Sequence, residues 1–120
     1  MCFINFSNHS SVSWVEQQRE EAQKWGDIID VAFPMVDSNL SGQEVEEMAG
    51  KCVADILRYH PSAVMCQGEF TLSYHVVSLL KEHGIPVLSA CSKRNVMEEK
   101  KQDGTVYKRS VFRFIQFREY

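Results

Sequence analysis

Three short polar segments carry the residue types that can bind or cleave an anionic ligand. They are Ser7-Asn8-His9, Gln67-Gly68-Glu69 with Thr71, and Ser92-Lys93-Arg94. The first segment offers a hydroxyl, an amide and an imidazole. The third offers two cations that suit phosphate, a bidentate guanidinium and a lysine point charge. Together these groups indicate an RNA-like ligand, with hydroxyls to hydrogen-bond and phosphates to neutralise.

Glu69 allows several interpretations. It precedes a helical pattern of apolar residues, so its carboxylate can complement the helix dipole, a contribution of about 0.3–1 kcal/mol. It can also hydrogen-bond a ribose hydroxyl or a base edge, or act as a base or nucleophile. The spacing of Glu69 does not separate these roles.

Several familiar sites are not supported by the sequence. The first strand–helix turn lacks G-x-G-x-x-G and no segment matches G-x-x-x-x-G-K-[ST], which argues against dinucleotide and NTP chemistry. Cys91 and Arg94 are too close together for a thiolate phosphatase loop, and no nearby acid orients His9 for a Ser-His-Asp triad. The cysteines and histidines show no metal-ligand spacing. We expect neither a metal site nor a cofactor, and we interpret the cysteines as reduced thiols.

Composition and charge narrow the class of protein further. The chain has 120 residues, 44% hydrophobic and 24% charged, which fits one globular domain over residues 1–120. No apolar run approaches the roughly 18–20 residues that cross a bilayer, and there is no leader pattern, so we expect a cytoplasmic protein. Residues 93–120 carry a net charge of +4 and residues 1–92 one of −7. The basic segment fits either an anionic ligand or a solvated hairpin face.

Hydrophobic periodicity and turn signals predict alternating strands and helices. We expect strands over residues 2–6, 27–33, 62–67 and 86–91, with helices starting at two capping boxes and after the turn at Gly68. The capping boxes are Ser13 with Glu16 and Ser41 with Glu44. Residues 95–101 and 105–119 flank Asp103-Gly104, which predicts a hairpin with a type I′ turn. Trp14 and Trp25 are expected to pack against the sheet.

This order of elements predicts an α/β fold. It is a small Rossmann-like domain, a parallel sheet flanked by helices with a C-terminal antiparallel β-hairpin. If the first and third strands are neighbours, their carboxyl ends form the topological switch point where ligands bind in such sheets. The three polar segments would then border one crevice.

The second half of the chain resembles a known family. The matching features are Gln67-Gly68-Glu69-Phe70 with Tyr74, Ser92-x-Arg94, Glu98 or Glu99, Asp103-Gly104, Val111-Phe112 and Phe117-Arg118-x-Tyr120. From Gln67 to Tyr120 the chain resembles the Csx-twenty family of small CRISPR-associated proteins, relatives of the nucleotide-sensing CARF domains. The amino-terminal half matches less well, with Ser7-Asn8-His9 where the family has a Ser-His step.

The resemblance implies a ring nuclease that cleaves cyclic oligoadenylate, with cyclic tetra-adenylate as the expected ring, and switches off type III CRISPR signalling. It implies a homodimer and a metal-independent attack of a ribose 2′-hydroxyl on the adjacent phosphorus, with no DNA or membrane partner. As catalytic residues we expect Arg94, Glu69 and His9. As ligand-binding residues we expect Ser7, Asn8, Gln67, Gly68, Thr71, Ser92 and Lys93.

Three alternatives remain open. The first is a binder of cyclic oligoadenylate, a sponge or sensor that does not cleave it. The second is a nucleoside-processing enzyme of the deoxyribosyltransferase type, with Glu69 as nucleophile. The third is an interaction module whose basic hairpin meets a protein partner.

Overall fold

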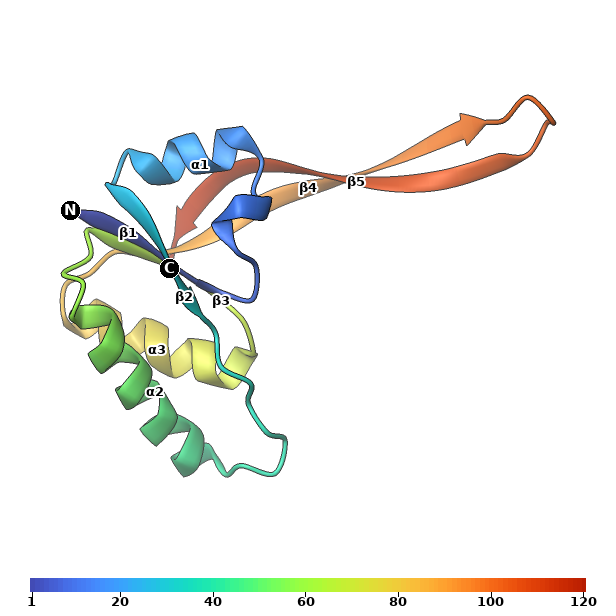
Figure 1. The fold of residues 1–120 in the computed structure, drawn as a ribbon. Helices are drawn as coiled ribbons and strands as arrows, with labels where there is room; N and C mark the ends of the chain where they lie inside the picture. Colours follow the sequence, from blue (N-terminus) through green and yellow to red (C-terminus); the bar gives the residue numbers. More distant parts are fainter.

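A five-stranded sheet in the order β2-β1-β3-β4-β5 organises the chain (Figure 1). The computed structural model describes residues 1–120. The strands are β1 (Cys2–Ser7), β2 (Asp27–Ala32), β3 (Ala63–Gln67), β4 (Val87–Lys100) and β5 (Val106–Glu119). The helices are the 3₁₀ turn η1 (Ser11–Ser13), α1 (Glu16–Gln23), α2 (Gly42–Leu57) and α3 (Phe70–Glu82). No helix is long and apolar enough to cross a membrane.

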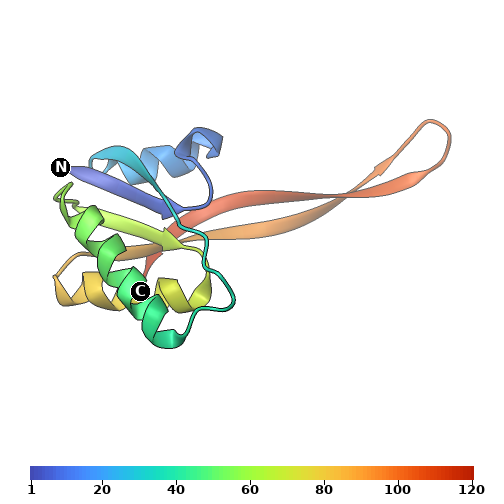
Figure 2. The same ribbon diagram turned by 60° about the horizontal axis from the view of Figure 1, so that its bottom comes forward.

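The sheet is parallel through its first four strands and antiparallel at β5. β1 lies between β2 and β3 and pairs in parallel with both, and β3 pairs in parallel with β4. The chain leaves β1 through α1 on one face of the sheet and returns from β2 through α2 on the other (Figures 1 and 2). The predicted α/β fold is confirmed, and the switch point lies between the carboxyl ends of β1 and β3.

Each face of the sheet has its own apolar layer, because successive side chains of a strand point to opposite faces. Ile4 and Phe6 are fully buried on the side of α2 and α3. Phe3 packs on the other side with Trp14, and Trp25 is half-buried against this second layer. The prediction that both tryptophans pack against the sheet is confirmed.

One predicted capping box exists and the other does not. Ser41 accepts a hydrogen bond from the N–H of Glu44, whose side chain accepts one from the N–H of Ser41. The box of Ser13 with Glu16 was a wrong prediction, since α1 begins at Glu16 without a side-chain cap. The Ser13 hydroxyl instead donates to the Ser10 carbonyl at 2.7 Å, because Ser10 to Ser13 form a separate 3₁₀ turn.

The fourth strand is longer than predicted. We expected it to end at Cys91, but β4 continues to Lys100 after a register shift between Cys91 and Ser92. The polar residues after Cys91 do not end the strand, because antiparallel pairing with β5 satisfies their backbone groups. Ser92, Lys93 and Arg94 are therefore strand residues instead of a loop.

The hairpin is confirmed, but its turn is of a different type. The Gly104 N–H donates to the Lys101 carbonyl at 3.0 Å, and the Lys101 N–H donates to the Thr105 carbonyl at 2.8 Å. Gly104 has φ = +87° whereas Asp103 has no positive φ, so the type I′ turn was a wrong prediction. A type I turn followed by a glycine with positive φ closes the three-residue loop.

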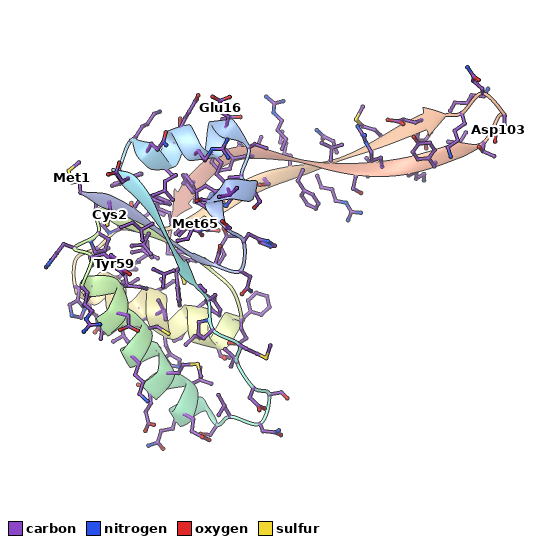
Figure 3. The ribbon with its side chains drawn as sticks, viewed as in Figure 1. Met1, Cys2, Glu16, Tyr59, Met65 and Asp103 are labelled. Atoms are coloured by element: carbon purple, nitrogen blue, oxygen red, sulfur yellow. The ribbon has the colours of Figure 1, made fainter.

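β4 and β5 extend together beyond the rest of the sheet (Figures 1 and 2). We call residues 93–113 of this hairpin the ribbon arm and the rest of the chain the body. In Figure 3, Asp103 marks the end of the ribbon arm that lies away from the body. The chain measures 56 × 38 × 21 Å with a radius of gyration of 17.3 Å. A compact chain of this length has about 14 Å, so the ribbon arm makes the molecule elongated.

Candidate functional site

A pocket of about 480 Å³ lies at the switch point, between the carboxyl ends of β1 and β3 and the base of the ribbon arm. This size falls in the range of about 300–1,000 Å³ that is typical of small-molecule sites. Its lining residues are Ser7, Asn8, His9, Ser13, Trp14, Val15, Gln18, Met65, Gln67, Gly68, Ala90, Ser92, Phe112 and Phe114.

The pocket brings together members of all three predicted polar segments. Six of the ten predicted site residues line it: Ser7, Asn8, His9, Gln67, Gly68 and Ser92. The other four lie outside its lining: Glu69, Thr71, Lys93 and Arg94. The part of the site that lies on β1 and β3 is therefore assembled, whereas the expected cations and carboxylate are directed elsewhere.

A polar network that runs from buried Asn5 and Ser7 to exposed Asp30 fixes the first loop at the pocket. Asn5, 1% exposed, donates from Nδ2 to the His9 carbonyl at 2.7 Å and to Asp30 Oδ1 at 2.9 Å. The Ser7 hydroxyl donates to Asn5 Oδ1 at 2.7 Å, so this oxygen is also satisfied. Asn5 and Asp30 were not predicted as site residues, although each is a polar residue between two apolar residues of a strand.

Asp30 holds the loop from the neighbouring strand β2. Its carboxylate accepts hydrogen bonds from the Ser11 N–H at 3.2 Å and from the Ser10 and Ser11 hydroxyls at 3.1 Å. Burial alone raises the pKa of Asp30, but the hydrogen bonds from Asn5, Ser11 and Ser10 lower it below its ordinary value. The ionised carboxylate therefore stabilises the loop that carries Asn8 and His9.

Gln67 bridges the gap between β3 and β4. The two strands pair only at Val64 with Val87 and at Met65 with Leu88. Above these pairs Gln67 Oε1 accepts a hydrogen bond from the Ala90 N–H at 2.9 Å. The side chain takes the place of a ladder bond where β4 diverges, and this divergence opens the pocket.

Gly68 allows the chain to pass close to Phe33. A Cβ atom at Gly68 would lie 2.5 Å from the Phe33 ring, too close for any side chain. Phe33 itself packs against Phe6 in a tilted arrangement, with ring centroids 4.8 Å apart. The glycine is thus required by the core beneath the turn, besides its place in the pocket lining.

Glu69 caps helix α3. Its carboxylate accepts hydrogen bonds from the Leu72 N–H at 2.8 Å, the Thr71 N–H at 3.1 Å and the Thr71 hydroxyl at 2.7 Å. These bonds, the one from Leu72 first, lower the pKa of Glu69. Both carboxylate oxygens act in the cap, and Glu69 borders a separate hollow with Asn8 and Pro34. This geometry supports the capping interpretation and gives no support to Glu69 as a nucleophile.

Arg94 lies on the ribbon arm beside the pocket: its cross-strand partner Phe112 lines the pocket, but Arg94 itself does not. It pairs with Phe112, and its Nε and Nη2 donate to the Ser110 hydroxyl at 3.1 and 2.9 Å. The guanidinium thus points along the ribbon arm. Lys93 pairs with Arg113 on the opposite face of the two strands. Neither residue lines the crevice as predicted, because the Arg94 guanidinium is held at Ser110 and Lys93 lies on the face of β4 opposite to Ser92 and Arg94.

The wall of the pocket formed by β5 and the first loop is aromatic, which the sequence analysis missed. Phe112 is 66% exposed, whereas Phe114 and Trp14 are buried. Phe114 packs edge-on against Phe117 at 5.0 Å between ring centroids. The Phe-x-Phe spacing at 112 and 114 places both rings on one face of β5, and this spacing was the available signal. Exposed aromatic rings can stack on nucleobases.

The chain offers no metal-binding cluster and no reactive thiol at this pocket. No three His, Cys, Asp or Glu side chains are grouped so that they could hold a metal ion. All four cysteines are free, and burial raises the pKa of the Cys66 thiol to about 12. The functional groups that remain at the pocket are hydroxyls, amides, the His9 imidazole and aromatic rings.

Residues 1–118 of the chain match a family described as "Uncharacterized protein MJ1673 family". No curated protein matches the chain. The family match includes both the body and the ribbon arm. Its description names neither an activity nor a role in CRISPR defence.

Proposed function

The chain belongs to the Uncharacterized protein MJ1673 family, and we propose that it binds cyclic oligoadenylate at the switch-point pocket and cleaves it as a homodimer. One observation carries this proposal. Six residues chosen from the sequence for an RNA-like ligand converge on a single pocket, together with exposed aromatic surface from Phe112. Hydroxyl and amide groups suit ribose and phosphate, and the ring suits adenine.

The cleavage that we propose needs no metal ion. A ribose 2′-oxygen attacks the adjacent phosphorus and loses its proton, while the bond from phosphorus to the 5′-oxygen breaks and that oxygen gains a proton. The products are a 2′,3′-cyclic phosphate end and a 5′-hydroxyl end. His9 is the imidazole of the pocket lining and takes the role of proton carrier. Ser7, Asn8 and Ser92 orient the sugar-phosphate in line.

A binder without cleavage is the second candidate, and a specific observation favours it. The pocket lining contains no Lys or Arg to stabilise a developing phosphorane charge, and Glu69 is held in the cap of α3. Hydrogen-bond donors and an aromatic ring suffice to hold a ground-state ring. This candidate gives a sponge or a sensor for the same ligand.

Single-turnover incubation with cyclic tetra-adenylate in EDTA tests both candidates. With enzyme in excess, we expect linear products that end in a 2′,3′-cyclic phosphate, resolved by chromatography. The variant His9→Ala should slow cleavage by about 100-fold or more, the usual contribution of general acid–base catalysis. His83→Ala, an exposed imidazole at the end of α3, is the matched control and should cleave like the wild type.

The other outcomes are distinct. An intact ring that co-elutes with the protein would support the second candidate, a binder that does not cleave the ring. Cyclic tri- and hexa-adenylate are tested in parallel, and if no ring is bound or cleaved the proposal is wrong. Release of free base from a nucleoside would instead support the deoxyribosyltransferase alternative.

A further inference from the structure

The ribbon arm has little support from its own chain. It contains eight successive pairs from Lys93–Arg113 to Lys100–Val106, a length of roughly 27 Å at about 3.4 Å per residue. All of residues 93–113 are exposed except Glu99 and Val111, which are half-buried. An isolated two-stranded ribbon is marginally stable in water, and both of its edges offer unpaired backbone groups.

The exposed surface of the ribbon arm includes apolar side chains on both faces. These are Val96 (57% exposed), Met97 (48%), Val106 (57%), Tyr107 (42%) and Phe112 (66%). Apolar residues gathered on a segment without a core indicate a surface that another molecule covers.

The charges of the ribbon arm and the body favour a second copy of the chain as the molecule that covers the ribbon arm. The ribbon arm has seven cations against three carboxylates, a net charge of +4, whereas the body carries −7. The end of the ribbon arm lies away from its own body (Figures 1 and 3), so it does not reach this acidic surface within one chain. A second copy presents the same acidic body. Two ribbon arms side by side would repel each other because both are positively charged. This favours docking of the ribbon arm of one copy on the body of the other.

The pocket lacks the positive charge that the ribbon arm has in excess. None of its 14 lining residues is Lys or Arg, although a phosphodiester ligand needs its charge neutralised. The cations at the far end of the ribbon arm, Lys100, Lys101 and Lys108, lie several residue pairs from the pocket of their own chain. If each ribbon arm docks on the other copy of a symmetric dimer, two equivalent contacts form, and each can place these cations at the partner's site.

We propose that the ribbon arm of each chain docks on the body of a second copy, and that its far end supplies the cations that the partner's pocket lacks. The second part rests on the proposed function, since it assumes an anionic ligand in the pocket. The first part concerns the free protein alone.

Light scattering on the full chain tests the docking without any ligand. We expect twice the chain mass of 13.8 kDa at micromolar concentration, with dissociation as salt screens the contact. Arg109→Glu with Arg113→Glu reverses charge on one face of the ribbon arm and should give a monomer. Lys51→Glu in α2 with Arg58→Glu at the C-cap of α2 makes the same change in net charge and should leave the dimer intact. A wild-type monomer at all concentrations, or a dimer indifferent to the ribbon reversal, would overturn the docking.

Mixing two defective variants tests the shared site. Lys100→Gln, Lys101→Gln and Lys108→Gln neutralise the end of the ribbon arm, and Ser92→Asp places a carboxylate in the pocket lining. Each variant alone should lose cleavage of cyclic tetra-adenylate. In an exchanged mixture half of the dimers are mixed and one site of each is complete, so activity should return to about a quarter of the wild-type value.

The outcomes of this second experiment are separable from those of the first. Mixed dimers that form, as shown with differently tagged copies, but recover no activity would overturn the shared site. A wild-type dimer that neither binds nor cleaves any ring would overturn the proposed function and the shared site together, while the docking stands.

Discussion

At the scale of single residues, Asp30 fixes the first loop by accepting hydrogen bonds from Ser10 and Ser11. We expect Asp30→Asn to lower the free energy of unfolding by about 1 kcal/mol at pH 7, because the charge-assisted bonds to Ser10 and Ser11 weaken at a partly exposed position. The measurement is urea unfolding of both proteins. Equal midpoints would contradict the role that we assign to Asp30.

The pH dependence of this effect has a fixed sign. The pKa of Asp30 is lowered in the folded protein, so its stabilising contribution is present above the ordinary value near 3.8. The contribution is lost as the pH falls through the lower pKa of the folded state. The difference between the wild type and Asp30→Asn should therefore be constant from pH 5 to 7 and shrink below about pH 4.

Gly68 gives a second residue-scale prediction. Gly68→Ala should destabilise the protein by about 1–3 kcal/mol, because the new Cβ would lie 2.5 Å from the Phe33 ring. Gly50→Ala is the matched control, since nothing lies within 4 Å of its Cβ in the middle of α2. Alanine there should stabilise by about 0.5–1 kcal/mol. Thermal unfolding of the two variants should give shifts of opposite sign, and a stabilised Gly68→Ala would contradict the close approach.

These residues also show what the sequence allows one to predict. Ser7, Asn8, His9 and Gln67 were predicted to border one crevice, and all four line the pocket. This placement could be predicted because the carboxyl ends of neighbouring parallel strands meet at a switch point. The network of Asn5 and Asp30 was missed, since a polar residue inside a strand reveals its partner only when the strand neighbours are known.

At the scale of secondary-structure elements, the cap of α3 decides the role of Glu69. We expect Glu69→Ala to lower the melting temperature, since the N–H groups of Thr71 and Leu72 lose their acceptor. It should not abolish ligand binding or cleavage, because Glu69 does not line the pocket. Ser41→Ala, which removes the cap of α2, is the control and should lower the melting temperature alone. Loss of cleavage in Glu69→Ala with unchanged stability would restore Glu69 as a catalytic residue.

The elements themselves were predictable where local signals dominate. The box of Ser41 with Glu44 needs only four adjacent residues, so it could be identified from the sequence. The end of β4 could not be identified from the sequence, because it depends on pairing with residues some 20 positions later in the chain. Polar residues normally mark the end of a buried strand. In a ribbon that is exposed on both faces, polar residues continue the strand, so the segment from Ser92 to Arg94 is part of β4.

At the scale of the whole molecule, the ribbon arm contributes no residue to the two apolar layers. Every fully buried side chain belongs to the body, and Phe114 and Phe117 are the last β5 residues that pack on it. The stability of the body should therefore not depend on the ribbon arm, whose contribution is to shape and assembly. This separation makes a shortened chain a meaningful test.

We expect a chain in which an Asn-Gly turn replaces residues 95–111 to fold with a melting temperature close to that of the isolated wild-type chain, since no core residue is lost. Its radius of gyration, measured by X-ray scattering, should fall from the 17.3 Å of the single chain to about 14 Å. Because the ribbon arm carries the docking surface, the shortened chain should also stay monomeric at concentrations where the wild type is a dimer. If the shortened chain folds and still forms a dimer, the interface lies on the body. If the shortened chain does not fold, the ribbon arm stabilises the sheet and the pairs near Ser92 and Phe114 are not sufficient for folding.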